Sequence, residues 1–207
     1  MNIFQKFWNP TINYWKSILD KKLDFFKKHS AALTALLVFI VYLFTLAPSV
    51  VQIDSGELAA VQKTLGIAHP TGYPLFTILG FIFLKIPLPF TDIYKANLLA
   101  AFWCTLGIYF FIKSAQLLLT NLKIDSLDKK IKTKKNQTVE PAGNEFVKII
   151  LPSVAGGLLL AFSKTFWMQS TSVEVYSLQI FLFNLIAFVA LSAFFNEKDK
   201  IKQWIFV

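Results

Sequence analysis

The stretch SAALTALLVFIVYLFTLA, residues 30–47, decides the fold class of this chain. It carries no charged side chain over 18 residues, a length with which a helix can cross the hydrocarbon core of a bilayer. Pro48 follows at once, and proline cannot continue the hydrogen-bond ladder of a helix. The sequence therefore predicts a first membrane span that ends at Ala47.

The composition extends this prediction to the rest of the chain. Of the 207 residues, 55% are hydrophobic and 22 are phenylalanine, and the mean hydropathy is +0.54. A soluble domain of this length would be less apolar and more charged. Three further long apolar runs cover residues 96–119, 146–166 and 176–195. We therefore expect an all-α, polytopic membrane bundle of four spans, with no internal repeat.

Two shorter segments between the first and second spans predict helices of another kind. Residues 54–65 form a short helix, because Leu58, Val61 and Leu65 recur at helical spacing and Gly66 then stops it. The apolar run 75–86 is too short for a full span and is closed by Lys85 and prolines. We expect this run to be an interfacial helix on the outer side of the membrane.

The net charge of +9 comes from lysine alone, since the chain has no arginine. The lysines flank apolar runs, so membrane topology explains them better than a nucleic-acid partner does. The single cysteine, Cys104, lies inside an apolar run and excludes an intrachain disulfide or a cysteine-based metal site. The long basic lead and the Ala47-Pro48 junction favour an uncleaved signal anchor over a cleaved signal peptide.

The lysine distribution also predicts the topology. Residues 1–29 form a basic, aromatic lead, either amphipathic on the cytoplasmic membrane surface or disordered. With four spans, this lead and the lysine-rich linker 120–145 both lie in the cytoplasm, and the loop 48–95 lies outside. The last residues resemble the start of another apolar run. The chain is thus expected to be the N-terminal piece of a longer protein.

The outer loop contains the acids Asp54 and Glu57 next to the membrane. Acids are costly beside hydrocarbon and usually face an interior or a wet cavity. Their spacing also fits a capping box, in which Asp54 caps the helix and Glu57 reaches back to it. The functional alternative is that Asp54 acts as a general base toward an acceptor hydroxyl.

His69 and Glu174 are the other candidates on the outer side. His69 lies in the turn AHPTGYP, residues 68–74, and is either a solvated loop residue, a packing residue or a phosphate contact. Glu174 either complements the dipole of the last span or points into the same outer cavity as Asp54. The topology places both acids on one side, but sequence spacing does not show that they meet.

Four segments together resemble a membrane family called domain of unknown function 2723. They are DSGEL from residue 54, AHPTGYPL from residue 68, KANLL from residue 95, and TFWMQS followed by EVYSL from residues 165 and 174. That family is similar to the protein O-mannosyltransferases and belongs with the GT-C glycosyltransferases. The resemblance covers roughly residues 30–195. The family usually has arginine where this chain has Lys95, which lacks the planar fork of a guanidinium.

The resemblance implies the N-terminal part of a GT-C-like fold, and a function. It implies catalytic roles for Asp54 and Glu57. Substrate contacts are implied for the remaining residues of the motifs, namely His69, Tyr73, Lys95, Glu174 and Tyr176. The implied reaction moves a sugar, with mannose as the candidate, from a polyprenyl phosphate to a hydroxyl of a protein or glycan. A non-catalytic scaffold or a carrier of polar lipids is the alternative.

The same resemblance gives expectations for cofactors, partners and location. No cofactor is indicated, and a divalent cation is left open. The expected partners are the polyprenyl-phosphate sugar, the acceptor and the bilayer, without nucleic acid. We expect a multi-pass protein of a bacterial inner membrane, with its active face in the periplasm. The fragment by itself is expected to be inactive.

Overall fold

The structure, a computed structural model, describes residues 25–131 and 146–195, with side chains for residues 25–122 and 146–195. Within these ranges every regular element is a helix and no strand occurs, which confirms the predicted all-α class. The elements are a first helix (Phe25–Thr45), α2 (Ser55–Thr64), α3 (Pro74–Leu84), α4 (Asp92–Ile131), the π-helical turn η1 (Phe146–Ile150), α6 (Leu151–Ala161), α7 (Lys164–Thr171) and α8 (Val175–Phe195).

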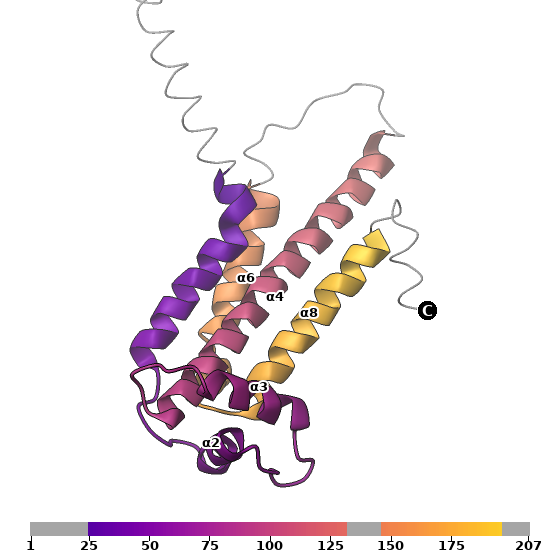
Figure 1. Ribbon diagram of the computed structural model, residues 1–207. Coiled ribbons are helices and arrows are strands. Elements are labelled where there is room, and N and C mark those ends of the chain that lie inside the picture. Colours follow the sequence, from indigo (N-terminus) through magenta and orange to yellow (C-terminus); the bar gives the residue numbers. More distant parts are fainter. Residues whose placement is uncertain (1–24, 132–145, 196–207) are drawn as a thin grey trace, which may run out of the picture.

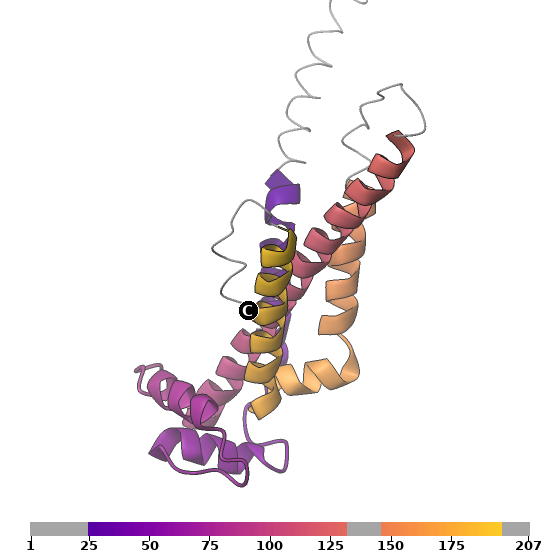
Figure 2. The same ribbon diagram turned by 90° about the vertical axis from the view of Figure 1, so that its right-hand side faces the viewer.

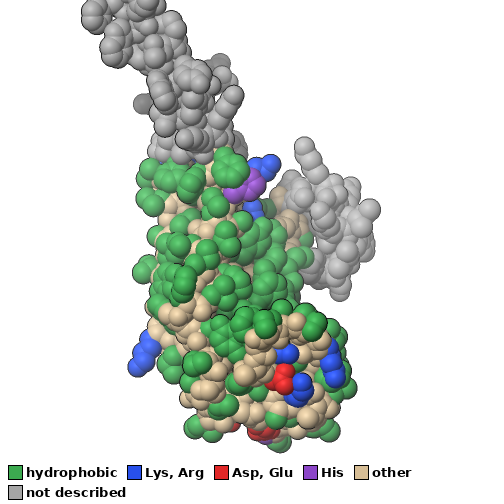
Figure 3. Space-filling model, turned by 60° about the vertical axis from the view of Figure 1, so that its left-hand side comes forward, with side chains coloured by type: hydrophobic (Ala, Val, Ile, Leu, Met, Phe, Trp, Pro, Cys, Tyr) green, Lys and Arg blue, Asp and Glu red, His purple; other side chains and the backbone are tan. Residues whose placement is uncertain are grey.

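Three helices are long and apolar enough to cross a membrane. They are Phe25–Thr45, the part of α4 from Asp92 to Leu122, and α8. They run roughly side by side along the bundle (Figure 1). Hydrophobic side chains cover much of the length of the bundle in Figure 3. A multi-pass membrane protein follows from these lengths and compositions.

The third predicted span, residues 146–166, is bent. Residues 146–161 and α7 meet at 67°, and Figure 2 shows α7 turning away from α6 at the foot of the bundle. The sequence predicted one helix as far as residue 166, but α6 ends at Ala161 and Ser163 has an extended backbone. The hydroxyl of Tyr42 donates to the Ala161 carbonyl at 2.7 Å, which satisfies one of the free acceptors at this helix end.

Helix α4 is the centre of the bundle. Its buried side chains Cys104, Ile108 and Ile112 form one core with Val38 and Tyr42 of the first helix. Glycines allow close approach on two sides of this core. A Cβ on Gly107 would press on Ile180 of α8, and one on Gly157 of α6 would overlap Ile112. The bundle therefore depends on small residues at helix contacts.

Helices α2 and α3 lie across one end of the bundle (Figure 1). With 11 residues, α3 is shorter than a membrane span. Pro74 takes its first helical position, where a missing N–H is tolerated. Gly80 of α3 faces the buried side chain of Gln62 on α2 so closely that any Cβ would overlap it. These two helices form the platform that carries the candidate site.

Several sequence-based predictions fall outside the described residues. They concern the basic lead up to residue 24, the part of the predicted linker 120–145 from residue 132 onward, and the chain after residue 195. The first part of that predicted linker, residues 120–131, is not a loop but continues α4, which extends past the ends of the other helices opposite α2 and α3 (Figure 1).

Candidate active site

Asp54 lies at the start of α2, on the platform end of the bundle. It occupies the N-cap position, and its carbonyl accepts a hydrogen bond from the Leu58 N–H at 2.9 Å. Its carboxylate is exposed and makes no capping hydrogen bond. The capping box that the sequence allowed is therefore not formed, and the carboxylate of Asp54 is accessible at the surface.

Glu57 binds the loop that follows α2. One of its oxygens accepts a hydrogen bond from the His69 backbone N–H at 2.7 Å, and the other lies 3.1 Å from His69 Nδ1. The backbone bond first, and the ring contact second, hold the pKa of Glu57 below its ordinary value. An ionised carboxylate accepts hydrogen bonds and cannot donate them, so Nδ1 of His69 carries the proton in its contact with Glu57. Nε2 is the ring nitrogen that does not take part in this contact.

A tight turn carries His69. The Gly72 N–H donates to the His69 carbonyl at 2.8 Å, and Gly72 has a φ of +85°, which glycine adopts without strain. The Tyr73 ring meets the His69 ring edge-on, with centroids 5.6 Å apart. The turn therefore holds the imidazole between Glu57 and Tyr73.

Glu174 reaches the same place from the connector between α7 and α8. Its side chain is almost fully buried, and its Oε1 lies 3.5 Å from the hydroxyl of Ser55. Burial raises the pKa of Glu174, and the negative charge of Asp54 raises it further, against the hydrogen bond from Ser55. The two acids on distant parts of the sequence thus interact through space, which spacing alone did not show.

Three polar side chains tie the two outer connectors together. Asn97 of α4 is completely buried; its Nδ2 donates to the Ala47 carbonyl at 2.8 Å and its Oδ1 accepts from the Val173 N–H at 2.8 Å. The Ser55 hydroxyl donates to the Val173 carbonyl at 3.0 Å. Gln52 donates to the hydroxyl of Ser172 and, at 3.2 Å, to the Met168 carbonyl. This network sets where Glu174 lies relative to Asp54.

Asp54, Glu57 and His69 also form a possible cation site. Each offers one ligand atom, and these atoms lie within 4.8 Å of one another. Carboxylate oxygens and an imidazole nitrogen together suit several first-row divalent metals. Both oxygens of Glu57 are already engaged by His69, so a cation would compete with those bonds. The divalent cation that the sequence left open has these residues as its candidate ligands.

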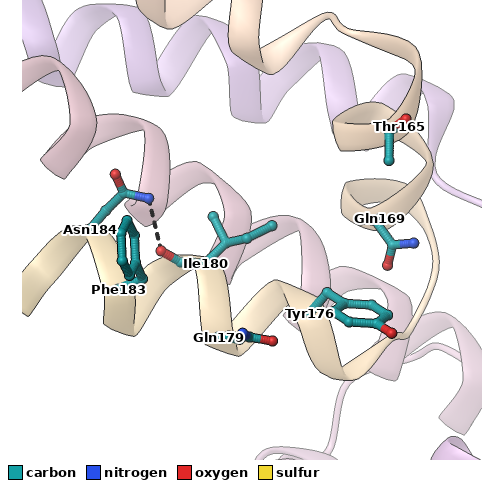
Figure 4. Close-up of a pocket in the computed structure, with 7 residues that line it drawn as sticks. All are labelled: Thr165, Gln169, Tyr176, Gln179, Ile180, Phe183 and Asn184. Carbon is teal, nitrogen blue, oxygen red and sulfur yellow. Dashed lines mark hydrogen bonds between the residues drawn. The ribbon is translucent and has the colours of Figure 1, made fainter.

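Two pockets flank the first half of α8. One, of about 460 Å³, lies between α7 and α8, where Gln169, Tyr176 and Gln179 supply polar groups (Figure 4). The other, of about 450 Å³, is mainly apolar and is lined by Tyr73 and the start of α3 on one side and by α8 from Val175 to Ile186 on the other. Tyr73 contacts His69, so the apolar pocket begins next to the cluster.

The residues that were predicted to contact substrate thus lie in different parts of the structure. Tyr73 and Glu174 adjoin the Asp54 cluster, whereas Tyr176 lines the pocket between α7 and α8. Lys95 is almost fully buried; its Nζ donates to the Leu84 carbonyl at 2.8 Å and pairs with Asp92 at 3.1 Å. Lys95 therefore holds the end of α3 against α4, and its substrate contact stays a prediction.

Ser55, Gln52 and Asn97 were not among the predicted site residues. Ser55 stands between the two acids of the DSGEL motif, and Asn97 is the polar residue of KANLL at the start of an apolar span. A polar side chain beside or within an apolar segment needs a hydrogen-bond partner. This need was the feature of the sequence that could have pointed to these residues. The identity of those partners depends on tertiary contacts.

Comparison with known proteins identifies the family of this chain. The family model described as "Protein O-mannosyl-transferase TMEM260 N-terminal domain" matches residues 54–207, about three-quarters of the chain. "Protein O-mannosyl-transferase TMEM260" of Mus musculus is 30% identical over 171 residues, covering 80% of this chain and 19% of the mouse protein. "Protein O-mannosyl-transferase tmem260" of Dictyostelium discoideum is 40% identical over 87 residues, covering 41% of this chain and 10% of that protein.

No solved structure matches the chain. The matched part of the chain spans about a fifth of the length of the mouse relative and about a tenth of the length of the Dictyostelium relative. The region matched by the family model begins at Asp54. Domain of unknown function 2723 is the older name of the matching family, so the resemblance found in the four motifs is confirmed. The chain belongs to the TMEM260 family of protein O-mannosyl-transferases, of which it carries the N-terminal domain.

Proposed function

We propose that the whole protein transfers mannose from a polyprenyl phosphate to a hydroxyl group of a protein or glycan on the outer side of the membrane. One observation carries this proposal: the exposed carboxylate of Asp54 lies beside the Glu57–His69 pair and within electrostatic reach of the buried Glu174. Titratable groups gathered in this way are typical of an active site.

In this proposal Asp54 is the general base. It accepts the proton of the acceptor hydroxyl, whose oxygen then bonds to the anomeric carbon of the sugar as the bond from that carbon to the phosphate oxygen breaks. The exposed position of Asp54 supports this role, since an acceptor can reach its carboxylate. Glu174 lies close enough to Asp54 for the negative charge of Asp54 to raise the pKa of Glu174.

His69 serves the leaving group. Glu57 holds Nδ1 and thereby fixes the ring, so Nε2 is the nitrogen that meets the departing phosphate. A protonated imidazole donates a hydrogen bond to that phosphate and stabilises the charge that develops on it. A divalent cation on the same three residues would supply the same stabilisation.

The polyprenyl tail needs an apolar groove beside these residues. The pocket between the start of α3 and α8 offers one, because its wall is mainly aliphatic and aromatic and it begins at Tyr73. The phosphate would then lie near His69 and the tail would extend along Leu178 and Phe183 of α8 toward the membrane interior. The apolar character of this pocket supports a lipid-linked donor over a soluble nucleotide sugar.

The donor is tested with the full-length protein in membranes. Samples receive radiolabelled mannose either on a polyprenyl phosphate or on a guanosine diphosphate, with an inhibitor of the conversion of the second into the first. We expect label in the protein or glycan fraction only from the lipid donor, and label on protein should be released by mild alkali, as for an O-linked sugar. Transfer from the nucleotide sugar but not from the lipid donor would contradict the proposal.

A further inference from the structure

A third pocket, with a different chemistry, lies at the far end of the bundle from Asp54. It has a volume of about 520 Å³, and Lys27, Lys28 and Lys113 all line it. Lysine side chains are visible at this upper end of the bundle in Figure 3. The four acids with described side chains, namely Asp54, Glu57, Asp92 and Glu174, belong to the platform end. The far end is therefore the basic end of the described bundle.

The position of Lys113 places this pocket at a membrane boundary. Lys113 comes 21 residues after Asp92 in the continuous helix α4 (113 − 92). At 1.5 Å per residue this is about 30 Å, which is the thickness of the hydrocarbon core. With the platform at one boundary, the pocket lies at the other, at the depth of lipid headgroups.

The lysines of this pocket differ from those on the platform in their partners. Lys63 and Lys95 both pair with Asp92, at 2.8 and 3.1 Å. Within the described residues, Lys28 and Lys113 form no ion pair or hydrogen bond, although Lys113 is half-buried. A partly buried ammonium group gains from an anion that enters the pocket.

The rest of the lining suits the other parts of a lipid. Gln116 and Thr120 lie one and two turns beyond Lys113 on α4 and offer polar groups at the headgroup level. Ile149 and Phe188 supply an apolar wall from two other elements. A free phosphate ion would gain nothing from such a wall, whereas acyl chains would.

We propose that this pocket binds the phosphate of an anionic phospholipid, with Lys28 and Lys113 contacting the phosphate and the acyl chains lying along Ile149 and Phe188. Basic pockets between membrane helices bind lipid headgroups by this combination of charge and apolar contact. The site is separate from the Asp54 cluster and does not depend on the proposed transfer reaction.

The test measures lipid binding by the full-length protein in a neutral detergent. The probe is phosphatidylglycerol with a fluorescent acyl chain, followed by anisotropy, with phosphatidylcholine of the same label for comparison. We expect preferential binding of phosphatidylglycerol. Changing Lys28→Gln and Lys113→Gln together should weaken it about 30-fold, from the usual contribution of two lysines near a lipid surface.

A matched pair controls for the loss of charge. Lys85→Gln with Lys164→Gln removes two exposed lysines outside this pocket and should leave binding unchanged. Lys28→Arg with Lys113→Arg keeps the charge and should restore binding, which also separates a local effect from misfolding. Equal affinity of wild type and the Gln pair would overturn the proposal. Equal loss in the control pair, or full displacement of the lipid by millimolar inorganic phosphate, would overturn it as well.

Discussion

Asn97 gives the sharpest test of how the two outer connectors are held together. Its side chain donates to the Ala47 carbonyl, after the first span, and accepts from the Val173 N–H, before α8, both at 2.8 Å. The change Asn97→Ala removes the side chain that both of these backbone groups bind. It leaves a donor and an acceptor unsatisfied inside the protein.

The expected cost follows from the burial of those groups. Val173 is 1% exposed and Asn97 is fully buried, so water cannot replace the lost bonds without rearrangement. An unsatisfied buried polar group costs about 1–3 kcal/mol. Ala47 is only half-buried. We therefore expect Asn97→Ala to lower the free energy of unfolding by about 2–4 kcal/mol.

The assay is unfolding of the full-length protein in mixed micelles with increasing dodecyl sulfate, followed by tryptophan fluorescence. Asn184→Ala is the control, because Asn184 donates only to the Ile180 carbonyl of its own helix, at 2.9 Å. It should cost less than about 1 kcal/mol, since that carbonyl keeps its backbone partner. An equal effect of the two substitutions would refute the role assigned to Asn97.

Three further predictions concern the platform and its acids. Gly80→Ala should destabilise the protein by about 1–3 kcal/mol, because a Cβ there overlaps the Gln62 side chain; thermal unfolding measures this. The pKa of Glu174 is raised in the folded state, so its ionisation opposes folding once the pH exceeds the pKa that this group has in the unfolded state. Glu174→Gln should therefore raise the free energy of unfolding at neutral pH. The pKa of Glu57 is lowered, so its contribution to stability is present above the pKa of the unfolded state and is lost as the pH falls through the folded pKa. Amide protection around His69, expressed as the exchange rate relative to that of an unstructured peptide at the same pH, should fall at acid pH in wild type but not in Glu57→Gln.

Each of these has a control and a contradicting outcome. Gly56→Ala, with its nearest atoms 3.7 Å away, should be neutral or stabilising, and a larger loss than at Gly80 would count against the packing argument. A less stable Glu174→Gln variant at neutral pH would show that the carboxylate gains more from its contacts than it loses by burial. If the loss of amide protection around His69 at acid pH persists in Glu57→Gln, a group other than Glu57 causes it.

The sequence predicts the fold well where hydropathy alone decides it. Most of the uncharged run 30–47 lies in the helix Phe25–Thr45, which ends two residues before the predicted end at Ala47, and the apolar run 176–195 lies in α8. The third apolar run is broken at residues 162–163. Hydropathy did not place this break, because the apolar residues on both sides keep the average of residues 146–166 high although Ser163 and Lys164 are polar. The break depends on local backbone conformation at Ser163 and on tertiary contacts of Ala161.

The candidate site divides in the same way. The chemistry-bearing residues Asp54, Glu57 and His69 could be selected from the sequence because charged and turn-forming residues are unusual beside a span. Whether Glu57 caps its own helix or binds His69 depends on the course of the loop after α2, which spacing does not fix. The burial of Glu174 depends on packing against Ser55, a contact between distant segments.

The central claim is that Asp54 is the base of a sugar transfer. Its direct test is Asp54→Asn in the full-length protein, assayed with a labelled polyprenyl-phosphate mannose, beside Asp92→Asn as a matched change in an acid paired with Lys63 and Lys95. Asparagine keeps the size and suits the N-cap position, so folding should be unaffected. We expect transfer by Asp54→Asn to fall about 100-fold or more while Asp92→Asn keeps most of its activity. Wild-type turnover by Asp54→Asn would contradict the account.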